Sequence, residues 1–480
     1  MRFLLIILFF IGLVAKAQPP HKFYSTYGGN GYDVGYDVKQ TLDGGYIITG
    51  STSSYGQGNT DMYLLKIDSM GQKVFQTTFG GVSNEIGKSV VQLLDSSYVM
   101  AGYTSSSGVG GYDVFLVKAD KSGNLIWQKT IGGSDWDFAN SMNATADGGF
   151  IIAGTTYSYG HGNADGYVIK TNANGDTTWT KTFGGINDDE FKSVIQTSDG
   201  NYALTGYTKS YNDIDSGDVW VLKLNTLGDT LWRKFYGQGQ EDFANQIIEH
   251  PNGQFFIAGG TKSFGVNKMN GYALNLDNNG NYIFQRLDNT STSYQSFNSI
   301  VISKRSNNLV NAMARETVGG YGAQMKMLEM NLSLNYQNAI DYGSNIEDEA
   351  YKIIATKDKG YACIGYTYGF GSILSDIYFY KTDSNLVGSQ SIVSVNEFEP
   401  DNIQLSVYPN PTSNELNIRM NLRMNVDQLK LYNISGQEIS IARRVTSNQY
   451  NKFTLNLEDL DNGFYILKYF NRVERISIVH

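Results

Sequence analysis

The chain is poor in the residues that build disulfide, redox and metal sites. Cys363 is the single cysteine among 480 residues, which excludes a disulfide bond within the chain. It lies in the apolar, strand-like run Tyr361–Gly365, which favours a buried, inert thiol over a nucleophile. The four histidines are not spaced with cysteine, aspartate or one another as metal ligands are. We therefore expect no metal site and no cofactor.

Basic residues and long hydrophobic runs are also scarce. The 37 lysines and arginines stand against 46 aspartates and glutamates, a net charge of −9, and they form no basic stripe. Nucleic acid is therefore not an expected partner. No segment beyond the N-terminal region is apolar enough to cross a bilayer, so we expect no transmembrane span. No nucleophile elbow or phosphate-binding loop is present, so any catalysis would depend on residues scattered along the chain.

The N-terminus has the pattern of a secretory signal. Arg2 precedes the apolar stretch Phe3–Val14, and Ala15-Lys16-Ala17 is a small-x-small cleavage site. We interpret residues 1–17 as a signal peptide and Gln18 as the first residue of the mature chain. The alternative, a membrane anchor, is disfavoured because the apolar stretch is too short to cross a bilayer comfortably.

Glycine and aromatic residues are abundant, and a short phrase built from them repeats at near-constant spacing. The 53 glycines, 34 tyrosines and 24 phenylalanines are typical of an all-β protein with many turns. An apolar residue followed by glycine recurs at Tyr27, Phe79, Ile131, Phe183, Tyr236 and Tyr342. The first four spacings are 52, 52, 52 and 53 residues, and a faded copy near Leu287 divides the remaining gap. A period of this size indicates a repeat architecture.

Each repeat contains four short strands, which we name A to D in chain order. In the second repeat they are Ser89–Leu94, Tyr98–Thr104, Asp113–Lys118 and Leu125–Thr130, with turn residues between them. Four such strands, repeated, describe one blade of a β-propeller. A glycine recurs at one position of strand B, where we expect close packing: Gly50, Gly102, Gly154, Gly206, Gly259 and Gly365.

The number of repeats predicts a closed, seven-bladed β-propeller over residues 18–391. The seventh repeat has a strand B at Tyr361–Gly365 and a strand C at Asp376–Lys381, but no convincing strand D follows. Phe23–Gly29 resembles the missing strand, so we predict that this N-terminal strand completes the last blade and removes an open sheet edge. The alternative, an open solenoid, would need polar caps that the sequence does not show. The sixth repeat, about Leu287–Asp341, is degenerate; it is interpreted as a decayed blade, or alternatively as one altered for binding.

A different module follows Ser391. We interpret residues 392–404 as a linker and residues 405–480 as a small Ig-like β-sandwich, because strands and turns alternate there. Three motifs stand in order in this module: Tyr408-Pro409-Asn410-Pro411, Tyr432-Asn433-Ile434-Ser435-Gly436-Gln437 and Gly463-Phe464-Tyr465. Together they closely resemble the type A C-terminal sorting domain of the type IX secretion system of Bacteroidota. The sorting-motif residues that the resemblance assigns are Tyr408, Pro409, Asn410, Pro411, Gly436, Gly463 and Tyr465.

The resemblance also implies a route and two partners for the chain. A protein with this module would cross the outer membrane from the periplasm through the type IX secretion machinery. The sortase of that system would remove the module, and the protein would be attached to surface lipopolysaccharide or released. The expected location is therefore secreted or attached to the outer-membrane surface.

Two acidic sets and one aromatic set recur at equivalent places in the repeats. One acidic set follows the glycine phrase: Asp33, Glu85, Asp137, Asp189, Asp242, Gln295 and Asp348. The other precedes strand C, and the aromatic set lies on the glycine-rich loops between strands B and C. Because D–A and B–C loops open on the same face of a propeller, we predict ligand-binding residues at Tyr55, Asp61, Tyr159, Asp165, Tyr211, Asp218, Phe264 and Phe370. An acid present in nearly every blade is more often architectural, which is the interpretation we favour for both acidic sets; for the aromatics both interpretations are open.

These features favour a binding protein over an enzyme. Aromatic rings and carboxylates on glycine-rich loops suit an extracellular glycan, a peptide or a protein as ligand. The alternative is a propeller hydrolase or lyase that acts on polysaccharide, although a circle of equivalent carboxylates gives no reason to choose two. A third hypothesis is a purely structural surface layer.

Overall fold

The computed structural model describes most of the chain, in segments of unequal length. The described residues are 22–211, 216–264, 268–288, 295–305, 309–317, 323–344, 346–370, 372, 374–387, 405–420, 429–433, 437–441, 444–449, 452–469 and 472–480. The chain divides into two compact units, unit 1 (Met1–Val393) and unit 2 (Ser394–His480). The predicted signal peptide and the predicted linker lie outside the described residues. The described residues contain strands and no helix, so no helix among them has the length and hydropathy to cross a membrane.

The described part of unit 1 forms seven antiparallel sheets of four strands each. The A strands are β2 (Asp33–Gln40), β6 (Glu85–Gln92), β10 (Asp137–Ala144), β14 (Asp189–Gln196), β18 (Asp242–Glu249), β22 (Gln295–Ile302) and β26 (Asp348–Ala355). The B strands are β3 (Tyr46–Thr52), β7 (Tyr98–Thr104), β11 (Phe150–Thr156), β15 (Tyr202–Thr208), β19 (Phe255–Thr261), β23 (Leu309–Thr317) and β27 (Tyr361–Thr367). The C strands are β4 (Asp61–Ile67), β8 (Asp113–Ala119), β12 (Asp165–Thr171), β16 (Asp218–Leu224), β20 (Asn270–Leu276), β24 (Ala323–Asn331) and β28 (Asp376–Thr382). The D strands are β5 (Lys73–Phe79), β9 (Leu125–Ile131), β13 (Thr177–Phe183), β17 (Thr230–Tyr236), β21 (Tyr282–Asp288), β25 (Tyr336–Tyr342) and, from the N-terminus, β1 (Phe23–Tyr27).

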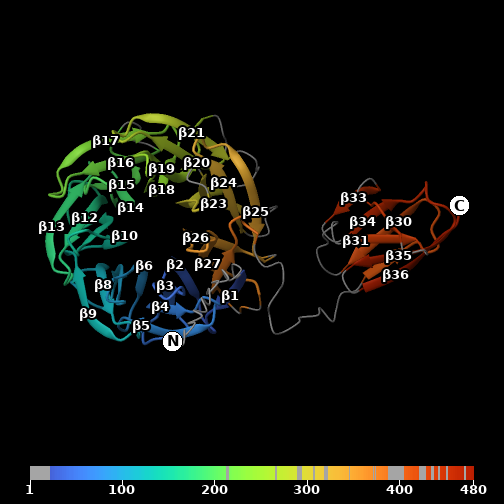
Figure 1. Ribbon diagram of the computed structural model, residues 1–480, viewed down its shortest axis with the longest axis horizontal. Helices are drawn as coiled ribbons and strands as arrows, with labels where there is room; N and C mark the ends of the chain where they lie inside the picture. Colours follow the sequence, from blue (N-terminus) through green and yellow to red (C-terminus); the bar gives the residue numbers. More distant parts are fainter. Residues whose placement is uncertain are drawn as a thin grey trace, which may run out of the picture. The chain divides into compact units, whose positions relative to one another are not determined.

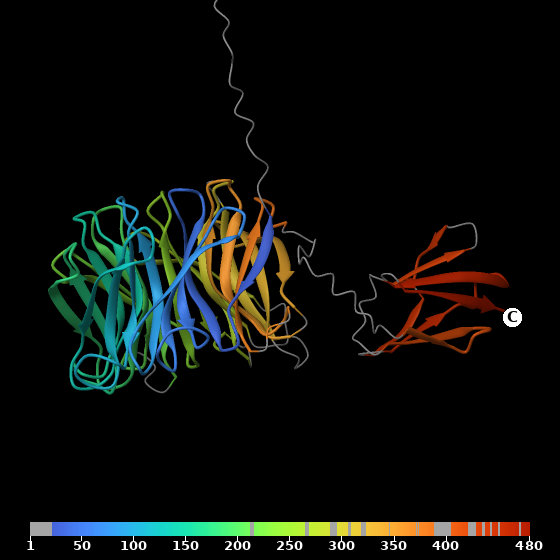
Figure 2. The same ribbon diagram turned by 90° about the horizontal axis from the view of Figure 1, so that it is seen from below.

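The sheets stand side by side around a central axis, with the A strands innermost and the D strands at the rim (Figure 1). Each sheet contacts the next one along the chain, and β26 of the last sheet contacts β2 of the first. The circle is therefore closed, and unit 1 is an all-β propeller, as predicted. Figure 2 shows the strands of this unit from the side, with loops gathered at two opposite faces.

The N-terminal strand completes the last sheet. β1 pairs antiparallel with β28, from Phe23 opposite Lys381 to Tyr27 opposite Ile377. The order of this sheet is β1-β28-β27-β26, so its outermost strand comes from the opposite end of the unit. The pairing covers an edge of β28 that would otherwise present unpaired backbone groups.

The core of unit 1 lies between neighbouring sheets. Every described residue of β3, β11 and β19 is buried, because each B strand is covered on both faces. One apolar cluster, for example, joins Ile48 of the first sheet to Ile364 and Phe379 of the last. The recurring strand B glycine permits this packing, since a Cβ at Gly102 would lie 1.8 Å from the carbonyl oxygen of Ile86. The close packing expected at this position is confirmed.

Aromatic side chains of the D strands pack on the turn between strands C and D of the following sheet. A Cβ at Gly175 would lie 2.7 Å from the Trp127 ring, and the φ angle of Gly175 is +76°. Both facts require glycine there, because a side chain would be strained and would collide with the indole. Phe23 of β1 takes the same place against Gly71 of the first sheet.

Unit 2 consists of two four-stranded sheets over one apolar core. One sheet has the order β29 (Leu405–Tyr408), β30 (Glu415–Met420), β34 (Lys452–Asn456), β33 (Val445–Gln449). The other has the order β32 (Glu438–Ile439), β31 (Leu429–Asn433), β35 (Gly463–Tyr469), β36 (Arg472–Ile478). Leu416 and Ile418 of the first sheet and Leu431, Leu467 and Ile476 of the second meet in this core, with almost no exposed surface.

Candidate functional site

The predicted loop tyrosines tie the B–C loops to the neighbouring D–A loops. The hydroxyls of Tyr55, Tyr159 and Tyr211 donate to the carbonyl oxygens of Gly28, Gly132 and Gly184, at 2.6, 2.8 and 2.7 Å. The two sets of loops therefore meet on one face of the propeller, as the topology predicts. Tyr159 remains 45% exposed on that face.

Phe264 and Phe370 occupy the equivalent places in two other sheets, without the hydroxyl. Both have positive φ angles, 62° and 55°. Each packs on a tyrosine of its own C strand, and the ring centroids of Phe370 and Tyr378 are 5.2 Å apart. Phe370 is 42% exposed. The five predicted aromatics thus share one position in their loops. Their contacts there stabilise the loop, and the exposed part of the Tyr159 and Phe370 rings could still contact a ligand.

The predicted acids are buried at the start of the C strands, beneath the loops. Oδ2 of Asp61 accepts from the backbone amide of Gly58 at 3.0 Å. Oδ2 of Asp165 accepts from the amides of His161 and Gly162 at 2.8 and 3.1 Å. Asp218 is 2% exposed at the same place in β16. The carboxylates of Asp61 and Asp165 hold their B–C loops, and a direct role for the three acids in ligand binding stays a prediction.

The acids at the start of the A strands are buried as well. The carboxylate of Asp137 accepts from the amide of Gly133 at 2.8 Å and from the hydroxyl of Ser158 at 2.7 Å. A Cβ at Gly132 would lie 2.0 Å from Asp113 Oδ1 and 2.7 Å from Asp137 Oδ2. Two carboxyl groups from neighbouring sheets therefore converge on one glycine, and burial together with the Asp137 charge raises the pKa of Asp113.

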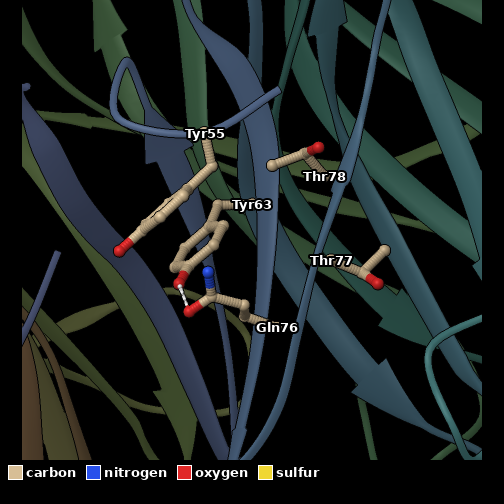
Figure 3. A pocket seen from close by; sticks show the side chains of 5 residues that line it. All are labelled: Tyr55, Tyr63, Gln76, Thr77 and Thr78. Atoms are coloured by element: carbon tan, nitrogen blue, oxygen red, sulfur yellow. Dashed lines mark hydrogen bonds between the residues drawn. The ribbon is translucent and has the colours of Figure 1, made fainter. Parts of the chain in front are cut away.

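Tyr55 also lines an open hollow of about 340 Å³ on the first sheet. Figure 3 shows the Tyr55 and Tyr63 rings lying parallel, with Gln76 below them. The Tyr63 hydroxyl donates to Gln76 Oε1 at 2.9 Å, and Thr77 and Thr78 complete the wall. The hollow offers part of the Tyr55 ring and several polar side-chain groups to a polar ligand.

A larger group of aromatic rings lies where the second and third sheets meet, and its residues were not among those predicted. We name Tyr103, Tyr112, Trp136, Phe138 and Tyr157 the channel-mouth cluster. Tyr103 and Phe138 have ring centroids 4.9 Å apart, and Trp136 is within 6.3 Å of Tyr112, Phe138 and Tyr157. Trp136 is 48% exposed and Tyr157 is 41% exposed. The cluster thus presents an indole and a phenol on a base of three further rings.

Three loops and two strands supply this cluster, and Tyr103 lies on β7. Trp136 ends the D–A loop before β10, Phe138 lies on β10, and Tyr112 and Tyr157 come from B–C loops. The backbone amide of Tyr157 donates to the Trp136 carbonyl oxygen at 2.7 Å, which joins two of these loops. A Cβ at Gly111 would lie 2.0 Å from Trp136 Nε1, so glycine allows the indole to lie against that loop.

Charged side chains accompany the aromatic rings on either side of the cluster. Lys209 pairs with Asp188 at 3.4 Å, and Lys192 pairs with Glu190 at 2.5 Å. On the other side of the axis the Tyr366 hydroxyl donates to Glu347 at 2.6 Å and to Glu349 at 3.2 Å. The face therefore combines aromatic surface with carboxylates and ammonium groups.

Below the cluster, an axial channel with a cavity of about 100 Å³ is lined by polar residues of the A strands. Its lining is Tyr36, Asp37, Lys88, Ser89, Asn140, Ser141, Lys192, Ser193, Asn245, Gln246, Asn298, Tyr351 and Lys352. A β-bulge in every A strand, such as the one between Gly87 and Ser89, explains this composition. At a bulge two consecutive side chains can face the axis, which regular alternation would forbid.

In six of the seven bulges, one residue forms a hydrogen bond with the next sheet. The amide of Val194 donates to Ser141 Oγ at 3.2 Å, and the amide of Ile353 donates to Ser299 Oγ at 3.1 Å. Asp37 plays this part in the first sheet, where Oδ2 accepts from the amide of Val90 at 3.0 Å. These contacts join the sheets to one another. The residue that precedes the connecting one differs in chemistry from sheet to sheet, as Tyr36, Lys88 and Asn140 show.

Two lysines in the channel have unusual electrostatics. The ammonium of Lys88 lies over the Tyr36 ring, 3.6 Å from its centroid. Burial and the nearby charge of Lys192 lower the pKa of Lys88 to about 8, against the opposite influence of acidic neighbours. Burial likewise lowers the pKa of Lys352 to about 8, although Asp37 opposes the shift.

In unit 2 the predicted sorting motif contacts the last strand. Asn410 Nδ2 donates to the Arg475 carbonyl oxygen at 2.7 Å, and the Ser477 amide donates to Asn410 Oδ1 at 2.8 Å. Tyr408, Pro409 and Pro411 flank this contact on the surface. Gly463 begins β35, and the buried Tyr465 donates to the Asp461 carbonyl oxygen at 2.9 Å. Gly436 lies outside the described residues.

Comparison with known proteins identifies the C-terminal module. Residues 406–478 match the model of the secretion system C-terminal sorting domain. The chain is 27% identical over 238 residues to regulatory protein FlaEY of Caulobacter vibrioides, a match that covers 42% of this chain and 24% of FlaEY. The chain thus spans about a quarter of that relative's length. Similar solved structures include the Pan2 WD40 domain of Neurospora crassa, at 11% identity and a TM-score of 0.45 over 75% of this chain and 97% of that one. Sqt1 from Chaetomium thermophilum is 10% identical, with a TM-score of 0.42 over 82% of this chain and 97% of that one.

The sorting tail implies interaction with the type IX secretion machinery, export, and a cell-surface or secreted location. The chain is a propeller protein with this tail, since unit 1 has the propeller fold and the matched residues lie in unit 2.

Proposed function

We propose that this secreted propeller is a binding protein and that its ligand, an extracellular glycan, docks on the channel-mouth cluster. The observation that carries the proposal is the half-exposed Trp136 beside Tyr157, on a base of three further rings. Single exposed aromatics are common on protein surfaces, but a contiguous group of them is typical of binding sites. The face of an aromatic ring suits the C–H surface of a sugar, and an indole provides the largest such face.

Hydrogen-bonding groups next to the cluster support a sugar ligand. The carboxylates of Asp135 and Asp188 can accept hydrogen bonds from sugar hydroxyls. Asp135 precedes Trp136 in the same loop, and the Asp135 amide is itself held by Ser158 Oγ at 2.9 Å. The rigid sheets below hold these loops in place, as is common for sites built on loops.

The aromatics predicted from the repeats are part of the same proposal, as an outer set of contacts. Tyr159 and Phe370 each expose more than two fifths of their surface on the face that carries the cluster. The hollow beside Tyr55 offers a further ring face. A glycan chain, a peptide or a protein loop could extend from the cluster toward these positions, and a glycan is favoured because the exposed surface is aromatic and hydroxylated rather than aliphatic.

An alternative function is cleavage of a polysaccharide, either by hydrolysis or by the elimination reaction of a lyase. Glu190 and Glu349 lie near the channel mouth from different sheets, and paired carboxylates can act as acid and base in glycoside hydrolysis. Glu190, however, is engaged by Lys192 and by Asn140 Nδ2, the latter at 2.9 Å. Such engagement suits a structural carboxylate better than a free acid, so binding is the first proposal.

For the sorting tail, we propose that the sortase of the type IX system removes unit 2 after export. The remaining propeller would be attached to the cell surface or released. In either location its binding face would meet polysaccharides of the surroundings or of other cells.

Binding of the secreted protein to a glycan array, followed by calorimetry on the hits, tests the proposal. Trp136→Ala should weaken binding at least tenfold, because the largest exposed ring face is lost. Tyr282→Ala is the matched control, since Tyr282 is an exposed aromatic on the D strand of another sheet. Equal binding by wild type and Trp136→Ala, with the control unchanged, would place the site elsewhere. Release of shortened saccharide by the wild type would favour the hydrolase or lyase.

A further inference from the structure

The Lys88 ammonium is a cation without a hydrogen-bond acceptor among the described residues. It lies over the Tyr36 ring, which satisfies one side of the charge. Its remaining surroundings are the other residues of the channel wall. An ammonium group carries three donors, and a ring face uses at most part of them. The open donors face a cavity of about 100 Å³, which is large enough for a small charged group.

Lysines outnumber acids in the lining of the channel. Three lysines, Lys88, Lys192 and Lys352, stand there against one acid, Asp37. Lys39 pairs with Asp37 at 2.8 Å and Lys192 pairs with Glu190 at 2.5 Å. A negatively charged ligand group would therefore meet a lysine-rich lining, whose amides and hydroxyls can also form hydrogen bonds with it.

The lysine lies near the aromatic cluster. Trp136 contacts Tyr112, and Tyr112 contacts Tyr103 at a centroid distance of 5.4 Å. Burial raises the pKa of Tyr103, and Tyr36, whose ring lies against the Lys88 ammonium, is near enough to add to this shift. A ligand on the cluster can therefore place a substituent at the channel mouth.

We propose that Lys88 binds a carboxylate and that the glycan on the channel-mouth cluster is acidic, with the carboxylate of a uronic acid residue entering the channel. This inference rests on the proposed function. A carboxylate carries a negative charge that complements the lysine-rich lining, and a cavity of about 100 Å³ suits a carboxylate rather than a whole sugar ring. Neighbouring sugar residues of the same chain would lie on Trp136.

The proposal predicts a preference that depends on pH. The charged and titratable groups that face Lys88 are Tyr36 of β2, Glu190 and Lys192 of β14, and Glu349 of β26. Because the pKa of Lys88 in the free protein is about 8, a rise in pH above that value removes the positive charge. The preference for an acidic over a neutral ligand should therefore be full well below pH 8 and decline above it, and a bound carboxylate, which raises that pKa, extends the decline to higher pH.

The test compares trigalacturonate with galactotriose by calorimetry on the mature full-length chain. Wild type should bind the acidic trisaccharide at least tenfold more tightly at pH 7, and Lys88→Met should lose that preference while keeping its affinity for the neutral sugar. Lys88→Arg should retain the preference. Lys121→Met is the matched control, because Lys121 is exposed in the C–D turn of the same sheet and should change nothing.

Several outcomes would overturn the inference. Equal affinity of wild type for the two sugars, or unchanged preference in a Lys88→Met variant with wild-type thermal unfolding, would refute the role of Lys88 and leave the glycan proposal standing. Binding of no glycan at all, acidic or neutral, would refute both. If Lys88→Met does not fold, the pH dependence of the wild type decides, and a preference that is constant from pH 6.5 to 9.5 counts against the proposal.

Discussion

The strongest prediction concerns the N-terminal strand that completes the last sheet. The double substitution Phe23→Ala and Tyr27→Ala removes two aromatic side chains that hold β1 in place. Phe23 stacks on Phe379 of the last sheet with centroids 5.4 Å apart and lies against Gly71 of the first sheet. The Tyr27 hydroxyl donates to the Gly71 carbonyl oxygen at 2.6 Å. Both side chains are half-buried.

The expected loss of stability follows from these contacts. Truncation of a fully buried phenylalanine costs about 3–5 kcal/mol, so two half-buried rings should contribute about 4 kcal/mol together. The lost hydrogen bond adds about 1 kcal/mol. With an unfolding entropy of about 2.1 cal/mol/K per residue, a total of about 5 kcal/mol lowers the Tm of a unit of this size by about 6 °C. Differential scanning calorimetry of wild type and variant measures this shift.

A matched control separates ring closure from simple loss of aromatic packing. Trp179→Ala and Phe183→Ala remove the equivalent side chains from β13, which a short turn joins to β12 of the same sheet. Both variants should lose stability, but only the β1 variant should free the edge of β28 and associate into dimers or aggregates on size-exclusion chromatography. An unchanged Tm with a monomeric β1 variant would refute the closure argument.

Two further predictions concern the turns and the tail. The buried Lys170 pairs with Asp147 at 2.9 Å, and hydrogen bonds from Thr145 and Lys170 lower the pKa of Asp147 to about 2. Asp147→Asn should therefore lower the Tm at pH 7, and the Tm values of variant and wild type should converge as the pH falls toward 2. Because Asp147 is largely exposed, the cost should be about 0.5–1 kcal/mol, and a difference in Tm that grows in acid would contradict the pairing. Removal of residues 405–480 should trap the protein in the periplasm, as judged by immunoblots of periplasmic, surface and medium fractions, and normal surface display of the truncated chain would contradict the sorting role.

The fold could be predicted from the sequence because its turns repeat at a fixed spacing. The two orphan features, a seventh repeat without strand D and a lone strand at Phe23–Gly29, pointed to the pairing of β1 with β28. The start of strand A was harder to predict. The apolar pattern of the second repeat places it at Ser89, whereas β6 begins at Glu85. The bulge between Gly87 and Ser89 breaks the alternation, so the residues before it do not show a strand period.

The candidate site was less predictable, for a related reason. Recurrence drew attention to Tyr55, Tyr159 and Asp61, and the structure uses recurrent positions to hold loops. Trp136 occupies a position that is tyrosine in the first repeat and aspartate in the fourth, so no recurrence marks it. A difference among equivalent positions near the axis was the available signal. The channel lysines were hidden as well, because a bulge turns them inward against the regular period.

The register of Phe23 opposite Lys381 also has a consequence for how the chain matures. The strand that is synthesised first has no partner until the residues of β28, near the end of unit 1, have emerged. Sealing of the propeller must therefore wait for nearly the whole of this unit, and such distant pairing slows folding because a long loop has to close first. The propeller therefore stays open until nearly all of unit 1 has been synthesised, and the length of the chain sets that delay.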